Sequence, residues 1–346
     1  MIHIVTLEKM DEWDAIVTSF DEYDVYYLSG YARGFYLHGD GEPMLVYYTG
    51  MTMRAIQVVM KRDISQIAPF QPLISGSTLY DFCTPYGYGG WIIEGNNEID
   101  TMMQEYDIWC KANGVVSEFV RYHPQLQHTG RLAEYYEQVY LGNTVEIPLL
   151  SEQRIWENFT SKNRNVIRKA IKNGLTVHSA CNLEIYEVFA EIYAETMRRD
   201  HADSYYFFSR KYFESICRDL KHNSAVFYVE TPENKIIAAA IILFANGRIH
   251  YHLSGSLKEY QSLAPTNLLL YEVARWGAEN GYCKFHLGGG LGARADSLFA
   301  FKKAFYRGEP LQYHIGKRIV DATAYWKLVN LREDIENKGF FPQYRG

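Results

Sequence analysis

Two hexapeptides, "WCKANG" (109–114) and "WGAENG" (276–281), occupy corresponding places in two halves of the chain. Each puts a Trp one helical turn before an Asn-Gly pair, which is typical of a helix end because Gly readily adopts the left-handed conformation needed there. A run of strand-forming residues follows each pair. Two unrelated helices could end with the same chemistry, so the surrounding element order decides between a repeat and a coincidence.

The first half predicts a series of strands, then a helix and a further strand. Runs rich in β-branched and aromatic residues, separated by Gly and Pro, predict strands at residues 25–31, 43–50, 53–62 and 79–93. Asn97 is a candidate cap for a helix that ends at Asn113, and residues 115–124 predict the next strand.

The second half predicts the same order after a helical preface. Residues 224–230, 236–244 and 248–256 predict three strands, and Asn246-Gly247 predicts a tight hairpin between the last two. A helix at 266–281 leads to a strand at 283–289. The shared order favours two α+β units of similar plan in one chain.

Composition indicates a soluble globular protein of two domains. The chain has 346 residues, 47% of them hydrophobic, and no run approaches the roughly 20 apolar residues of a membrane span. The N-terminus does not resemble a signal peptide, and five scattered cysteines form no CxxC pair, so we expect a cytoplasmic protein with reduced thiols. The net charge of −6 means that any contact with a polyanion requires a local basic patch.

Four segments together resemble the Fem-type peptidoglycan bridge-forming aminoacyltransferases, which carry two Gcn5-related N-acyltransferase (GNAT) domains in tandem. The segments are "YDFCTPYGYGG" (80–90), "SKNRNVIRKAIKNG" (161–174), "YHLSGS" (251–256) and "FHLGGG…DSLFAFKKAF" (285–305). The resemblance covers nearly the full length. No segment holds the heptad pattern of the coiled-coil arm that some members insert, and the first-domain glycine motif matches only loosely.

This resemblance implies an α+β fold of two tandem GNAT-like domains, each a mixed, mostly antiparallel sheet flanked by helices. The expected domains are residues 1–148 and 149–346, the second carrying the acyl-transfer site, and the C-terminal helix can pack back on the first. The implied activity is transfer of an aminoacyl group from aminoacyl-tRNA to an amine of a peptidoglycan-precursor peptide. No covalent enzyme intermediate is required for such transfer, so the lack of a recognisable Ser-His-Asp or Cys-His arrangement is compatible with this activity.

Lys302 is the first catalytic candidate. Asp296 can cap a helix on which Phe299, Lys302 and Tyr306 form one line, so aromatic rings border the lysine. A surface lysine covering apolar residues is the structural alternative. The resemblance implies that Phe301-Lys302 is the family's Phe-Lys pair, whose lysine lies at the acyl-transfer centre; Lys303 is expected to be solvated.

Residues 161–172 contain five cations and no acid. Arg164, Arg168 and Lys172 recur every four residues and predict one cationic stripe, opposite Ile167, Ala170 and Ile171. The stripe could grip a diphosphate or the acceptor end of tRNA, or it could be a solvated helix face.

The remaining binding candidates are polar aromatic residues, glycines and one arginine. Tyr251 can donate a hydroxyl to substrate or act as a core residue, and we expect Gly288 and Gly289 to let the backbone pass close to a bound peptide or splay from the neighbouring strand. The substrate-contacting set is completed by Tyr86, Tyr88 and Arg199.

We expect the protein to require no cofactor and no metal ion. The GNAT loop that binds the coenzyme A pyrophosphate reads "QSLAPT" (261–266) here, where Ala264 replaces a glycine and Pro265 lacks an N–H donor, so coenzyme A is disfavoured as donor. A metal trio of His250, His252 and His286 is conceivable, but ordinary strand histidines are favoured. Two alternatives stay open: an acyl-coenzyme A-dependent N-acetyltransferase acting on a small amine or sugar, and a non-catalytic muropeptide- or tRNA-binding protein.

Overall fold

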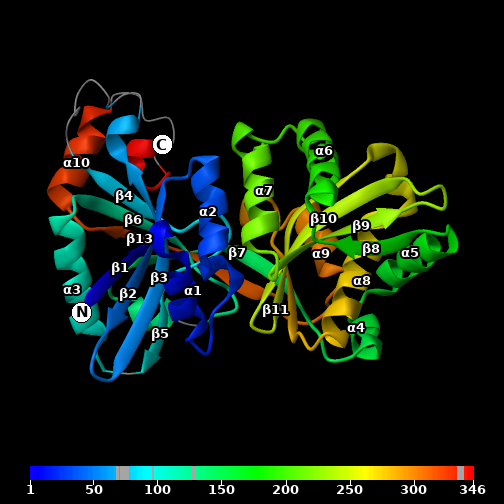
Figure 1. Cartoon of the computed structure of the whole chain (residues 1–346), viewed down its shortest axis with the longest axis horizontal. Coiled ribbons are helices and arrows are strands. Elements are labelled where there is room, and N and C mark those ends of the chain that lie inside the picture. Colours follow the sequence, from blue (N-terminus) through cyan, green and yellow to red (C-terminus); the bar gives the residue numbers. More distant parts are fainter. Residues whose placement is uncertain (68–69, 71–77, 96, 127–128, 333–338) are drawn as a thin grey trace. The chain divides into compact units, whose positions relative to one another are not determined.

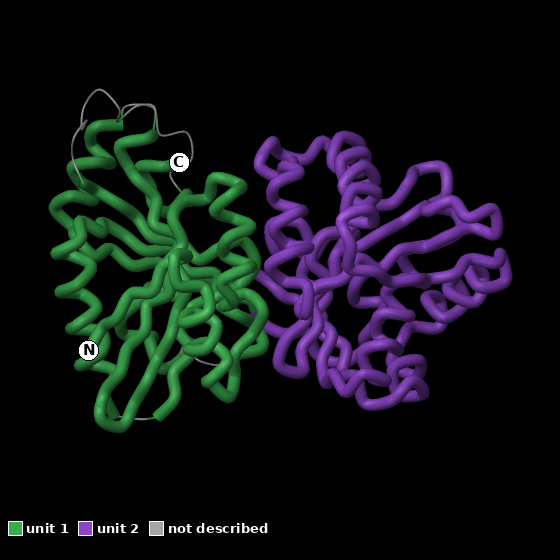
Figure 2. The backbone as a smooth tube through the Cα atoms, in the orientation of Figure 1, with its two compact units in different colours: residues 1–141, 313–346 green, residues 142–312 purple. Residues whose placement is uncertain are grey.

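The computed structural model describes residues 1–67, 70, 78–95, 97–126, 129–332 and 339–346. The chain forms two compact units, residues 1–141 with 313–346 and residues 142–312 (Figure 2). The expected boundaries, 1–148 and 149–346, therefore differ from the observed ones, because the C-terminal segment returns to the first unit.

The first unit is a mixed sheet with helices packed on it (Figure 1). The strands lie in the order β1-β2-β3-β4-β6-β13, and β5 pairs with β3. All described pairings are antiparallel except β4 with β6. The elements are β1 (Ile2–Thr6), α1 (Met10–Thr18), α2 (Ser29–His38), β2 (Glu42–Thr49), β3 (Met53–Asp63), β4 (Tyr80–Cys83), β5 (Ile92–Gly95), α3 (Ile99–Ala112), β6 (Val115–Arg121), β13 (Leu311–Ile319) and α10 (Ala322–Leu331).

The second unit repeats this plan in the strand order β7-β12-β11-β10-β9-β8. Only β11 and β12 are parallel among its described pairings. The elements are β7 (Glu137–Pro148), α4 (Glu152–Asn158), α5 (Ser161–Lys172), β8 (Thr176–Ala180), α6 (Leu183–Arg199), α7 (Arg210–Asp219), β9 (Ser224–Glu230), β10 (Ile236–Ala245), β11 (Arg248–Ser256), α8 (Pro265–Glu279), β12 (Lys284–Gly288) and α9 (Ser297–Lys303). The predicted α+β class, with mixed and mostly antiparallel sheets, is confirmed.

The two hexapeptides have the same geometry in the two units. Asn113 Nδ2 donates to the Trp109 carbonyl at 2.8 Å, and Asn280 Nδ2 donates to the Trp276 carbonyl at 2.8 Å. The following Gly has a φ of 70° in the first case and 79° in the second. Each helix then leads to a strand that pairs in parallel with an earlier strand of its unit, β6 with β4 and β12 with β11. The structure thus supports a repeated unit rather than a chance match.

The last strand of each sheet explains the unit boundaries. β7 follows β6 in the chain but pairs with β12, whereas β13 follows β12 and pairs with β6. The sheet of each repeat therefore includes one strand that lies outside that repeat in the sequence. Local patterns cannot reveal such an exchange, because both partners look like ordinary strands.

Two local predictions in the first unit were wrong. Residues 25–31 form a 3₁₀ turn and the start of α2 instead of a strand, because the Asp24 carboxylate accepts a hydrogen bond from Val25 N at 2.6 Å and caps this segment. Asn97 does not cap α3; Glu98 holds the N-cap position, and its carboxylate instead accepts hydrogen bonds from the turn between β2 and β3.

Each unit has its own apolar core against its sheet. The core of the second unit joins β7, β10 and β12 to the buried faces of α5 and α8, and includes Phe305 just after α9. Among the helices in the described residues, none has both the length and the apolar content that a bilayer crossing requires.

Candidate functional site

Lys302 lies on helix α9 of the second unit. Asp296 Oδ1 accepts from Phe299 N at 2.8 Å, as the sequence predicts, and Oδ2 accepts from Leu291 N at 2.9 Å in the preceding loop. The helix end is also fixed, because Thr160 N donates to the Ala304 carbonyl at 2.9 Å. Lys302 is only 8% exposed, so the alternative of a surface lysine is excluded.

The Lys302 ammonium lies between a backbone carbonyl and an aromatic ring. Nζ donates to the Gly289 carbonyl at 2.7 Å and is 6.0 Å from the centroid of the Tyr251 ring. Burial lowers the pKa of Lys302 to about 8, and the Asp296 carboxylate partly opposes this shift. The group is consequently a cation at neutral pH that can lose its proton under mildly alkaline conditions.

Tyr251 supplies a hydroxyl on the strand beside this lysine. Its OH donates to Ser254 Oγ at 2.6 Å within β11. Burial raises the pKa of Tyr251 to about 12, so the phenol remains protonated and can serve as a hydrogen-bond donor. The structure therefore brings together the two residues predicted as catalytic.

The glycines after β12 shape the loop that holds Lys302. Gly288 has a φ of 77°, and the register of β12 against β7 shifts between His286 and Gly288. A Cβ on Gly289 would lie 2.8 Å from the Asn143 carbonyl of β7. Of the two expected roles, the geometry supports departure from the neighbouring strand, with the Gly289 carbonyl directed at the ammonium.

The basic helix α5 is joined to α9. Asn163 Nδ2 donates to the Ala304 carbonyl at 3.4 Å, two residues beyond Lys302. Arg164 donates to the carbonyls at the end of α4, with the shortest contact 2.5 Å to Phe159. Arg164 thus ties α5 to the end of α4, and its contact with substrate stays a prediction.

The rest of the stripe is exposed to solvent. Arg168 lies over the Trp156 ring, 5.1 Å from its centroid, and donates to Asn165 Oδ1 at 2.9 Å. Lys172 is exposed and so is Ile171, at 51%, which corrects the expected apolar face. The helix thus offers charged side chains on its open face.

Two other candidates, Arg199 and Phe301, and the neighbouring Lys303 make contacts within the second unit. Arg199 Nη1 donates to the Ser256 carbonyl at 2.7 Å and ties the end of α6 to the end of β11. Phe301 is partly buried edge-to-face against Phe305. Lys303 donates to the Tyr306 and Gly308 carbonyls after α9, so the expected solvated role is wrong.

Tyr86 and Tyr88 lie in the first unit within a cluster of rings. The Tyr86 carbonyl accepts from Tyr31 OH at 2.6 Å. The Tyr88 ring packs edge-to-face on Tyr26 and Tyr313, at 5.5 Å in both cases, and burial raises its pKa well above the ordinary value. Both tyrosines are held by the fold of this unit.

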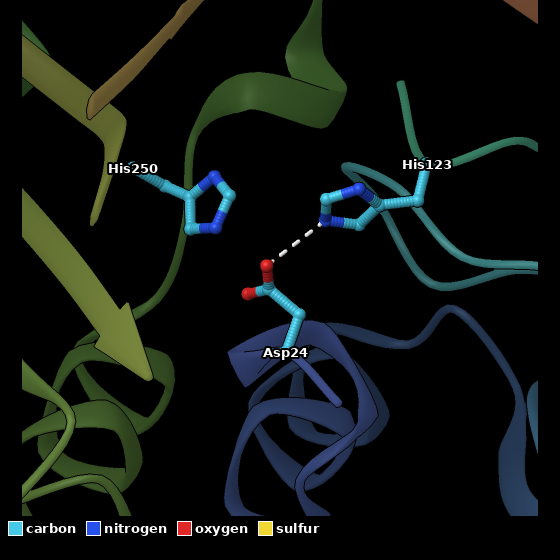
Figure 3. A group of neighbouring side chains, drawn as sticks. All are labelled: Asp24, His123 and His250. Atoms are coloured by element: carbon cyan, nitrogen blue, oxygen red, sulfur yellow. Dashed lines mark ion pairs between the residues drawn. The ribbon is translucent and has the colours of Figure 1, made fainter. Parts of the chain in front are cut away.

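A buried contact between an aspartate and a histidine beside this cluster was not predicted from the sequence. Asp24 Oδ2 lies 3.1 Å from His123 Nε2, and both side chains are almost wholly buried (Figure 3; His250, also drawn, belongs to the second unit). His123 Nδ1 accepts from Gln125 N at 3.2 Å, so the proton must be on Nε2, facing the carboxylate. The two residues are far apart in the sequence, and no spacing pattern could have revealed the pair.

Two of the strand histidines of the second unit pack ring against ring, and the third contacts a tyrosine. The His250 and His286 rings lie edge-to-face with centroids 5.8 Å apart, and His252 Nε2 is 2.8 Å from Tyr212 OH. Among the described residues of this unit, ligand atoms of these three histidines do not converge within 4.8 Å. Burial lowers the pKa of His252 to about 3.

The loop before α8 offers few amides for a phosphate. Ala264 has a left-handed φ of 57°, and its N–H donates to the Gln261 carbonyl at 3.0 Å. Pro265 occupies the first helical position and has no N–H. A pyrophosphate at this helix start would find neither donor.

Comparisons with known proteins agree with this fold. Residues 161–303 match the model of the acetyltransferase (GNAT) domain family. The structure of FemX is similar over 94% of this chain and 99% of its own, with a TM-score of 0.71 and 15% identity. A conserved protein of unknown function from Bacteroides thetaiotaomicron is similar over 92% and 100%, with a TM-score of 0.61 and 10% identity.

L-PGS from Bacillus licheniformis is similar over 89% of this chain and 91% of its own, with a TM-score of 0.56 and 14% identity. Among curated proteins, none matches the sequence. Residues 161–303 thus form a GNAT-type acetyltransferase domain, and the chain as a whole has the fold of FemX.

Proposed function

We propose that this protein transfers an aminoacyl group from aminoacyl-tRNA to an amine of a peptidoglycan-precursor peptide. The observation that carries the proposal is the buried Lys302 ammonium, held at 2.7 Å by the Gly289 carbonyl inside the GNAT-type domain. A cation in a dry site stabilises the charge that develops on the carbonyl oxygen during acyl transfer.

The reaction is a direct attack. The neutral amine adds to the ester carbonyl of the aminoacyl-tRNA, and the carbonyl electron pair moves to the oxygen. Collapse of this oxyanion breaks the ester bond, the amide forms, and the proton lost by the amine ends on the ribose hydroxyl. Lys302 has three N–H donors, of which Gly289 accepts one, so another can bind the oxyanion. One such donor contributes about 3 kcal/mol to lowering the barrier.

Two features favour tRNA over coenzyme A as the donor. At the start of α8 the Ala264 N–H is already bonded to the Gln261 carbonyl and Pro265 has no N–H, so a pyrophosphate would find two fewer donors there. The exposed cations of α5 can contact a phosphate backbone next to α9, where arginine and lysine side chains bind without reading sequence. The peptide acceptor is the one that the resemblance to the Fem-type aminoacyltransferases implies, and the likeness of the fold to FemX supports it.

The direct test compares Lys302→Met with Lys303→Met. We expect turnover of aminoacyl-tRNA with a UDP-linked muropeptide to fall well over tenfold in the first variant and to change little in the second, since Lys303 only binds carbonyls after α9. Near-normal turnover by folded Lys302→Met would overturn the assignment.

A second candidate keeps acyl-coenzyme A as donor, because the matched family is described as acetyltransferases. Calorimetry with coenzyme A separates the two. Micromolar binding would favour the acetyltransferase, whereas little or no binding supports the tRNA-dependent reaction. Thermal protection by a muropeptide without consumption of either donor would indicate a binding protein that lacks the chemistry.

A further inference from the structure

A pocket of about 420 Å³ lies between α6 and α7 in the second unit, two helices that stand side by side in Figure 1. Its inner wall consists of Tyr186, Tyr193, Phe208 and Phe213, all buried. The volume falls in the range of small-molecule sites in proteins. The pocket is independent of the residues assigned to acyl transfer.

The rings in this wall are arranged to receive a flat apolar group. Phe213 packs edge-to-face on Tyr193 and Phe208, with centroids 6.3 and 6.4 Å away. At the mouth, Phe207 and Leu183 are each 40% exposed. A ligand with an aromatic body would cover these side chains and continue the edge-to-face packing.

The mouth of the pocket is acidic. Glu187, Glu191 and Glu214 line it together with a single cation, Arg210, which gives a local charge of −2. Arg210 lies 2.6 Å from Glu187 and 2.8 Å from Glu214, and its side chain is 70% exposed. Glu191 has no ion pair among the described residues. Carboxylates beside aromatic faces attract an organic cation and repel an anion.

We propose that this pocket is a binding site for a small organic monocation with an aromatic body, whose ammonium contacts Glu191 while its ring lies against Tyr193, Phe208 and Phe213. The site is separate from Lys302. Tyr251, Phe301 and Phe305, which surround Lys302, pack in the core cluster shared with α5 and α8, and none of the four residues of the pocket's inner wall belongs to that cluster. The two ligand sites therefore lie in different parts of the second unit.

The test titrates the full-length protein with phenethylammonium chloride and, as a charge-reversed match, sodium 3-phenylpropionate, by calorimetry and NMR. We expect saturable binding of the cation, at least tenfold weaker binding of the anion, and weakening of the cation complex by added salt. Glu191→Gln should raise the Kd about threefold, and Ala194→Leu, which adds volume inside the pocket, should remove most of the binding. Glu195→Gln, on the same helix outside the pocket, is the control and should leave the Kd unchanged.

Three results would overturn the proposal: equal affinity for the cation and the anion, a Kd that Ala194→Leu leaves unaltered, or absence of saturable binding to the wild-type protein. Lys302→Met should bind phenethylammonium as the wild type does; a loss there would place the ligand at the acyl-transfer residues and contradict a separate site. The outcome is independent of whether Lys302 proves catalytic.

Discussion

Lys302 Nζ donates a hydrogen bond of 2.7 Å to the carbonyl of Gly289, and this bond joins the helix that carries the lysine to the glycine loop that follows β12. A carbonyl accepts from the charged ammonium and also from the neutral amine, so it fixes the position of the nitrogen without fixing its charge. Burial then sets the charge, because it lowers the pKa of Lys302 to about 8.

The first prediction concerns the pH dependence of catalysis. If the ammonium stabilises the oxyanion, kcat/KM should decline about tenfold per pH unit above roughly pH 8, where Lys302 loses its proton. Lys302→Arg keeps the cation at all accessible pH values and should be slower but lack this decline. A pH–rate profile measured from pH 6 to 10 checks it; a rate that instead rises through pH 8 to a plateau would identify Lys302 as a base.

The second prediction concerns stability. The folded protein holds the pKa of Lys302 near 8, below the ordinary 10.5 of the unfolded chain, so the unfolded state binds more protons between these values. The free energy of unfolding should therefore rise with pH across this window, by up to about 3 kcal/mol from this group. Urea unfolding at pH 7.5 and 10 should show this contribution in the wild type but not in Lys302→Met. If the free energy of unfolding changes equally with pH in both proteins, the Lys302 ammonium is solvated in the folded state.

The parts of this site that the sequence predicts are the local ones. Asp296 precedes its helix by one residue, so its capping bond follows from spacing, and the Asn280-Gly281 helix end follows in the same way. The burial of Lys302 does not follow from spacing, because it depends on the Gly289 carbonyl delivered by another element.

Long-range pairs explain the failures. Residues 25–31 read as a strand in the sequence, and the structure adds the bond from Val25 N to the Asp24 carboxylate and the contact of Asp24 with His123. The return of β13 to the first unit is equally invisible, since pairing with β6 leaves no mark on the alternation of β13 itself. Local patterns could not predict where the chain returns to the first unit, although the family resemblance implied that the C-terminal helix can pack back on it.

The third prediction tests the glycine loop. In Gly289→Ala the new methyl group would lie 2.8 Å from the Asn143 carbonyl, a backbone atom that cannot rotate away. The loop must shift, the Gly289 carbonyl moves from Lys302, and we expect kcat to drop at least tenfold with a smaller change in KM. Gly130→Ala is the control, because a Cβ there meets nothing within 4 Å. Normal turnover in Gly289→Ala would show that the carbonyl does not position the lysine.

The fourth prediction tests the strand that completes the first unit. Arg318 of β13 lies 3.3 Å from the Glu118 carboxylate of β6, contacts Asp107 of α3, and is only 7% exposed. Arg318→Met leaves the buried Glu118 without its cation, so the free energy of unfolding should fall by about 3 kcal/mol, and Glu118→Gln in the same chain should restore part of the loss. Lys317→Met, whose partner Glu137 is 68% exposed, should cost less than 1 kcal/mol. Chemical unfolding of the four proteins measures these differences; equal stability of Arg318→Met and Lys317→Met would mean that β13 is not anchored to the first unit through this pair.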